Sequence, residues 1–138
     1  MKIPWYGFIH PVVSLLTLAY GLTIAQVGLT RINDWDYPLR QQRNRTIAYF
    51  LLCVGNFLLG LLFATLIRGR GAELKMPGHM ALSFVVLVVT AAATVVTFGK
   101  TRMGEVAQVT RIHPVLMVIS LAGVLTMGFL TAMRLFGI

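Results

Sequence analysis

The chain has 138 residues, of which 57% are hydrophobic and only 12% are charged. This composition excludes disordered and fibrous proteins. It also argues against an ordinary soluble domain, in which about a quarter of the residues are charged. The formal charge of +8 would suit nucleic-acid binding, but the basic residues lie in short clusters between long apolar runs. We therefore expect these clusters to contact membrane lipid headgroups, and we expect no nucleic-acid partner.

Four apolar runs are each long enough to cross a bilayer, which takes about 20 residues in a helix. They cover residues 11–29, 46–67, 78–98 and 114–135. Apolar residues surround each run instead of forming one stripe, which is typical of helices covered on all sides by lipid or by other helices. The sequence thus predicts an all-α integral membrane protein: a single four-helix bundle over residues 1–138, with both termini on the same side.

Short polar segments at 31–45, 69–77 and 99–111 connect these runs and leave no room between them for a soluble catalytic domain. The first and third segments together carry seven of the twelve basic residues, and five lie on the side of the termini. Cytoplasmic loops tend to be richer in Lys and Arg, so we expect the termini to face the periplasm or a lumen.

Three histidines, His10, His79 and His113, are the candidate cofactor ligands, because each lies at the N-terminal edge of an apolar run. Imidazole is a common axial ligand of haem iron. His10 and His79 open helices that run in the same direction, so we expect them at similar depth near the side of the termini. His113 lies near the opposite side. An interfacial His before a helix-starting Pro is also an ordinary helix start, and both interpretations stay open here.

The other polar and small residues of the apolar runs indicate contacts between helices, not a catalytic site. Asp and Glu occur only in the connecting segments, so no machinery for acid–base hydrolysis or proton pumping is visible. We therefore expect an electron carrier or a complex subunit, not a stand-alone enzyme. Asn56 and Gln26 are predicted to hydrogen-bond between helices, and Met117 and Cys53 to fill space. Close helix packing is predicted at Gly21, Gly28, Gly55, Gly60, Gly123 and Gly128.

One motif occurs twice, as Ile9-His10-Pro11-Val12 and as Ile112-His113-Pro114-Val115. Continuing without a gap, Leu18-Ala19 matches Leu121-Ala122, and Thr23 matches Thr126. The two helices run in opposite directions, so a genuine repeat would relate the two ends of the molecule by inversion. Chance agreement between apolar sequences is the alternative.

The order of motifs resembles the cytochrome b561 family, in a reduced four-helix form typified by uncharacterised membrane proteins of cyanobacteria and plastids. The likeness covers nearly the whole chain in layout. It is carried by Ile9-His10-Pro11, Arg43-Asn44-Arg45-Thr46, Pro77-Gly78-His79 and Arg111-Ile112-His113. The resemblance implies haem b, one between the first and third helices and a second between the second and fourth. It also implies a bacterial inner membrane or a thylakoid membrane.

Carried over residue by residue, the resemblance assigns His10 and His79 to the iron of the first haem. Independently of the resemblance, Arg70 and Lys75 are candidates to pair with its propionates on the side of the termini, and the alternative is that they simply anchor helix ends. For a second haem, His113 would be paired with Thr46, whose hydroxyl is a poor haem ligand. Three outcomes fit this pattern: one bis-His haem, a further five-coordinate haem on His113, or no haem.

Two functions follow as expectations. The first is electron transfer by a membrane b-type haem protein, with a quinone or a redox protein as partner, because one haem near one face cannot carry electrons across the bilayer. The alternative is a non-catalytic subunit, within a dimer or larger photosynthetic or respiratory complex, that ligates chlorophyll-type pigment through single histidines. A small transporter is a weaker interpretation, because no charge lies near the middle of a run.

Overall fold

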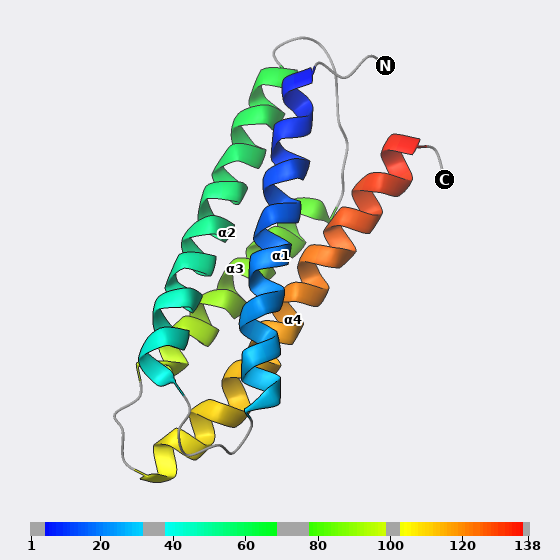
Figure 1. Ribbon diagram of the computed structural model, residues 1–138. Coiled ribbons are helices and arrows are strands. Elements are labelled where there is room, and N and C mark those ends of the chain that lie inside the picture. Colours follow the sequence, from blue (N-terminus) through cyan, green and yellow to red (C-terminus); the bar gives the residue numbers. More distant parts are fainter. Residues whose placement is uncertain (1–4, 32–37, 69–77, 99–102, 137–138) are drawn as a thin grey trace.

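The computed structural model describes residues 5–31, 38–68, 78–98 and 103–136. Within these ranges the chain forms four α-helices and one 3₁₀ turn, and no strand occurs there. After the 3₁₀ turn η1 (Trp5–Phe8) come α1 (Ile9–Thr30), α2 (Leu39–Arg68), α3 (His79–Val96) and α4 (Met103–Phe136). Figure 1 shows that α1 begins and α4 ends at the same end of the bundle. The predicted all-α four-helix fold is confirmed.

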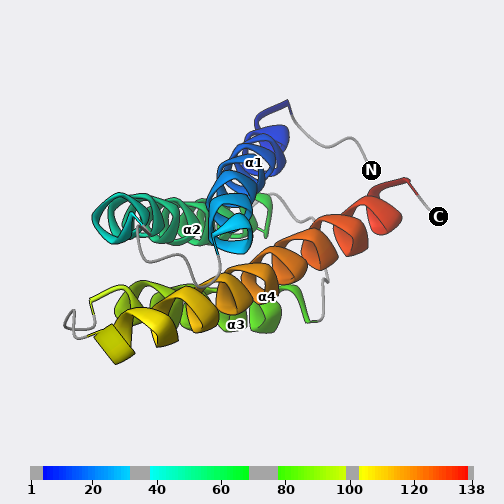
Figure 2. The same cartoon turned by 60° about the horizontal axis from the view of Figure 1, so that its bottom comes forward.

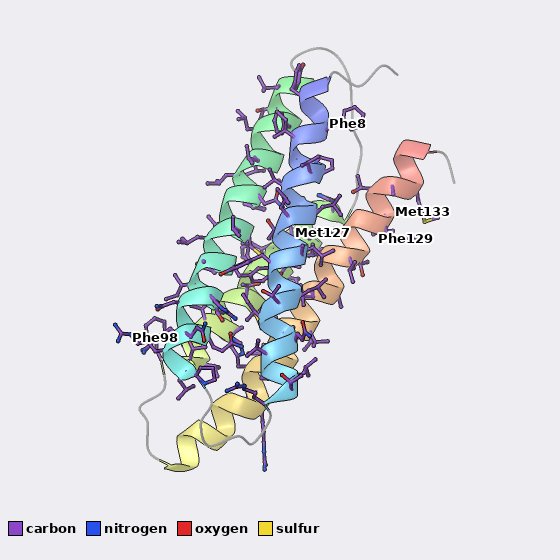
Figure 3. The ribbon with its side chains drawn as sticks, viewed as in Figure 1. Phe8, Phe98, Met127, Phe129 and Met133 are labelled. Carbon is purple, nitrogen blue, oxygen red and sulfur yellow. The ribbon has the colours of Figure 1, made fainter. Side chains whose placement is uncertain are left out.

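Each helix contains a stretch long and apolar enough to cross a membrane: Tyr6–Thr30, Leu39–Leu66, His79–Val96 and Arg111–Met133. Many large apolar side chains on these stretches are exposed, as expected where helices face lipid. Phe8 and Phe129, for example, project away from the bundle in Figure 3. These features are consistent with the predicted integral membrane protein.

The four helices form a ring in which each packs against two neighbours. The packed pairs are α1 with α2, α2 with α3, α3 with α4, and α4 with α1. Consequently α1 and α3 lie on one diagonal of the bundle, and α2 and α4 on the other (Figure 2). Both views show α4 diverging from α1 towards the end at which α1 begins. Cofactors within bundles are held by side chains of facing helices, so the two diagonals are where a site is sought.

The buried core includes Ile24, Tyr49, Cys53 and Met117, and the prediction that Met117 and Cys53 fill space is confirmed. Tyr49 reaches α1 because Gly21 has no side chain: an added Cβ would lie 2.5 Å from Tyr49 Cε2. Added Cβ atoms at Gly28, Gly60 and Gly123 would likewise meet neighbouring side chains within 3.2 Å. At Gly55 and Gly128 nothing lies within 4 Å, so the prediction of close packing is wrong for these two positions.

A chain of hydroxyl groups joins three helices inside this core. Thr90 donates its hydroxyl hydrogen to the Val86 carbonyl at 2.7 Å. Because a hydroxyl has one hydrogen, the 2.8 Å bond between Thr90 and Ser120 must be donated by Ser120. By the same reasoning Tyr49 donates to Ser120, at 3.3 Å. The chain therefore runs in one direction from α2 through α4 to α3 and satisfies buried polar atoms at each step.

Two helices extend beyond the predicted spans. α2 begins at Leu39 and α4 at Met103, within segments that hydropathy had indicated as connections. Pro38 starts α2, since its carbonyl accepts the Gln42 N–H at 2.9 Å, and the Arg and Gln residues that follow are good helix formers. Hydropathy detects only the lipid-facing part of a helix, so it missed these polar turns.

Pro114 lies inside α4, which corrects the expectation that His113 and Pro114 open the fourth helix. A proline interrupts the hydrogen bond to the residue four positions earlier, but the helix continues through it. Pro114 is buried against α1, where its Cγ would lie 3.0 Å from a Cβ added at Gly28. The same motif does open a helix in α1, where Pro11 falls in the first turn.

Candidate functional site: two diagonal pairs

The first diagonal brings His10 of α1 and His79 of α3 together near the end where α1 begins. His10 lies in the first turn of α1, directly after η1 in the chain. The Tyr6 ring of η1 stacks on Phe63 of α2, with ring centroids 6.2 Å apart. His79 is the first residue of α3. Its N-cap Gly78 has φ 87°, a left-handed conformation that suits glycine. The prediction that His10 and His79 lie at similar depth is confirmed by their contact.

The two imidazole rings have centroids 6.3 Å apart and planes inclined by 72°. With nitrogen–metal bonds of about 2 Å and ring nitrogens about 1 Å from each ring centre, two axial imidazoles on one metal have centroids roughly 6 Å apart. The observed centroid spacing is close to this value, although the Cε1 and Nε2 atoms of His10 lie nearest Gly60 of α2. Both side chains are half-buried in the isolated chain.

Both histidines carry the same local feature, a serine four residues later. Ser14 donates to the His10 carbonyl at 2.9 Å, and Ser83 donates to the His79 carbonyl at 2.7 Å. The Ser83 hydroxyl also lies 3.1 Å from Met127 Sδ of α4, labelled in Figure 3. This His-x-x-x-Ser pattern separates the His10–His79 pair from His113, and sequence reasoning missed it.

α2 supplies the wall beside His10. Asn56 donates from Nδ2 to Ser14 Oγ at 2.8 Å, which confirms the predicted interhelical hydrogen bond. One turn later, a Cβ added at Gly60 would lie 3.2 Å from His10 Cε1. Because Gly60 has no side chain, the His10 ring can pack against α2 at this position. Two buried polar atoms here have no hydrogen-bond partner: His10 Nδ1 and Asn56 Oδ1.

The second diagonal brings together Thr46 of α2 and His113 of α4, the pair that the family resemblance implies for a second haem. The two side chains are fully buried and bonded directly, with Thr46 Oγ1 2.9 Å from His113 Nε2. Thr46 donates its only hydrogen to the Gln42 carbonyl at 2.8 Å, so Nε2 of His113 must be the donor to Thr46. A protonated Nε2 has no lone pair for a metal, and no haem fits between atoms 2.9 Å apart.

Gln42 extends this second pair to α1. Its Nε2 donates to the Ile24 carbonyl at 3.1 Å, and its side chain is buried. Sequence reasoning did not single out Gln42, because it lies outside the apolar runs. Gln26, by contrast, has an exposed side chain, so the prediction that it hydrogen-bonds between helices is wrong. Gln42 makes such a bond instead.

The predicted propionate partners Arg70 and Lys75 lie outside the described residues. At the opposite end, the Arg43 guanidinium lies over the Phe98 ring, 5.3 Å from its centroid; Phe98 is labelled in Figure 3. Across the described ranges, no group of three or more His, Cys, Asp or Glu side chains gathers as a metal site would require. A metal centre there depends on the imidazole pair and on ligands brought by a cofactor.

The repeated His-Pro motif contributes one residue to each diagonal pair, His10 to the first and His113 to the second. In the same register Thr17 of α1 matches Ser120 of α4, and both are buried. Comparisons of the chain with protein-family models, curated proteins and solved structures found no match.

Proposed function

We propose that this chain is a b-type haem protein of a membrane that transfers single electrons, and that it binds one haem between His10 and His79. The observation that supports the proposal best is the 6.3 Å spacing of two imidazole rings on facing helices. Two neutral imidazoles are the usual axial donors for such a haem. Gly60 leaves space beside the His10 ring, where a side chain would press on it.

The Thr46–His113 pair supports a stoichiometry of one haem. The 2.9 Å bond leaves no room for an iron between these side chains, and the hydrogen on Nε2 prevents ligation through that nitrogen. A bound haem supplies a one-electron couple. His10 and His79 would hold its iron.

A haem near the end where α1 begins requires partners that reach that end. We propose that this end faces the periplasm or a lumen, which the bias of basic residues favours, in a bacterial inner membrane or a thylakoid membrane. The proposed electron partner is a quinone within the bilayer or a redox protein on that side. Without a second haem the chain acts as a branch or terminal carrier and not as a conductor across the membrane.

The test is to purify the protein in mild detergent and to record a reduced-minus-oxidised spectrum with a pyridine haemochrome for stoichiometry. We expect a b-type α-band and about one haem per chain, since one pair of imidazole rings has centroids spaced as axial ligands would be. His79→Leu should abolish the band. His113→Leu, the matched control on the other diagonal, should retain it.

Three outcomes would overturn the proposal. They are a full spectrum in His79→Leu, two haems per chain in the wild type, or a wild type without haem. A chlorophyll-type spectrum, with co-purification of a large complex, would favour the alternative of a photosynthetic complex subunit. A single histidine suffices to ligate such a pigment, and the exposed outer faces of the helices leave area for partner subunits.

A further inference from the structure

We infer that Asn56 is a positioning residue that holds the His10 ring with its hydrogen on Nδ1, so that Nε2 presents its lone pair to a metal. The inference rests on the proposed haem site and deepens it by naming the residue that selects the ligating nitrogen. It is carried by the hydrogen bonds of Ser14 and Asn56 and by the two buried atoms without partners beside them.

Counting hydrogens fixes the orientation of the Asn56 amide. Ser14 uses its only hydroxyl hydrogen on the His10 carbonyl, so its oxygen can only accept a further bond. The Asn56 atom 2.8 Å from Ser14 Oγ must therefore be the NH₂ group, and the carbonyl oxygen Oδ1 points elsewhere. Oδ1 is buried and accepts no hydrogen bond.

His10 lies beside the part of α2 that carries Asn56. Asn56 contacts Ser14, one turn after His10 on α1, and Gly60, one turn after Asn56 on α2, faces the His10 ring itself. His10 Nδ1 is the other buried atom here without a partner. A hydrogen bond from an N–H on Nδ1 to Oδ1 would satisfy both atoms.

This bond would have a definite effect on ligation. An imidazole that ligates a metal through one nitrogen usually donates from the other to a carbonyl or carboxylate, which fixes its tautomer and raises its basicity. Asn56 would give His10 that arrangement. At His113 the opposite tautomer is enforced, because Thr46 accepts from Nε2. In the same His-Pro motif, Nε2 would thus carry a lone pair at His10 and a hydrogen-bonded hydrogen at His113.

The first test needs no haem. The ring nitrogens of ¹⁵N-histidine have shifts that report which nitrogen is protonated, and the three signals are assigned with the His79→Leu and His113→Leu variants. In the haem-free wild type we expect His10 protonated on Nδ1. Asn56→Leu should move that hydrogen to Nε2, whereas Asn44→Leu, at an exposed position of the same helix, should change nothing.

The second test uses the haem-loaded protein. Asn56→Leu should weaken haem binding by about 10–100-fold, as losses of such ligand-orienting partners do, and should raise the midpoint potential. Asn56→Asp keeps an acceptor, should restore binding, and should lower the potential below that of the wild type. A merely structural role would not shift the potential in opposite directions in these two variants.

The outcomes separate the two ideas. A wild type without haem contradicts the proposed function, while the histidine tautomer of the haem-free protein still decides the role of Asn56. If haem binds but Asn56→Leu changes neither the His10 tautomer nor the potential, the role of Asn56 is overturned and the haem site stands.

Discussion

His113 shows how one neighbouring hydroxyl decides what a histidine can do. Thr46 already donates to the Gln42 carbonyl, so its oxygen accepts from His113 and keeps the hydrogen on Nε2. The sequence indicated Thr46 and His113 as a pair of positions, but it did not indicate that they bond to each other. That outcome depends on the separation of α2 and α4, which residue identity does not specify.

Replacing Thr46 by Val should lower the free energy of unfolding without changing haem content. Valine has the shape of threonine but cannot accept the His113 N–H, which would then be buried without a partner. We expect a loss of about 1 kcal/mol, typical of hydrogen bonds between helices in membranes. Denaturant unfolding in detergent measures it.

Thr126→Val is the matched control for this change, because Thr126 is exposed on α4 and bonds only to the Ala122 carbonyl of its own helix. Equal losses of stability in the two threonine variants would contradict a specific contribution from the bond between Thr46 and His113.

For whole helices, the sequence predicted existence and order but not which face lies inside. Apolar residues surround each run, so hydropathy carries no period from which the buried side can be identified. The buried Thr90–Ser120–Tyr49 chain was missed for this reason, whereas Asn56 was found because an amide deep in a span needs a partner. The depth of His10 and His79 was predictable because helix direction alone determines it.

Glycine positions on two helices give a matched prediction. Gly21→Ala should destabilise the bundle by about 1–3 kcal/mol, since the new Cβ would lie 2.5 Å from Tyr49 Cε2 and 2.7 Å from Leu121 Cδ2. Gly55→Ala meets nothing within 4 Å and should be neutral or stabilising, because alanine favours helix. The same unfolding assay distinguishes them, and a Gly55→Ala loss as large as that of Gly21→Ala would contradict the packing described for Gly21.

At the scale of the whole molecule, the two ends of the bundle carry different side-chain pairs on their diagonals. One diagonal ends in two histidines and the other in a hydrogen-bonded Thr–His pair. The half away from the termini is closed by buried polar bonds and by Met117, Tyr49 and Ile24. We expect the buried polar bonds of that half to stabilise the fold, and the proposed haem site lies in the other half.

Topology can be tested with a membrane-impermeant maleimide on intact and inverted vesicles. Gln41 is exposed in the first turn of α2, at the end opposite to the start of α1, so Gln41→Cys should react only from the side opposite to terminal tags. Cys53 is buried, so the wild type should stay unlabelled and serves as control. Labelling of the Gln41→Cys variant from the side of the tags would contradict the four-crossing arrangement.

The length of α2 has a consequence for the membrane that hosts it. Its 30 residues extend about 45 Å, whereas the hydrocarbon layer measures about 30 Å. The surplus includes the turn that carries Arg40 and Arg43, held at a fixed height by helical hydrogen bonds and not by a loop. Spin labels at successive positions from 40 to 44 would therefore step through the interface by about 1.5 Å each. The depth of each spin label in such a series would locate the membrane interface along α2 and thereby report the thickness of the surrounding bilayer.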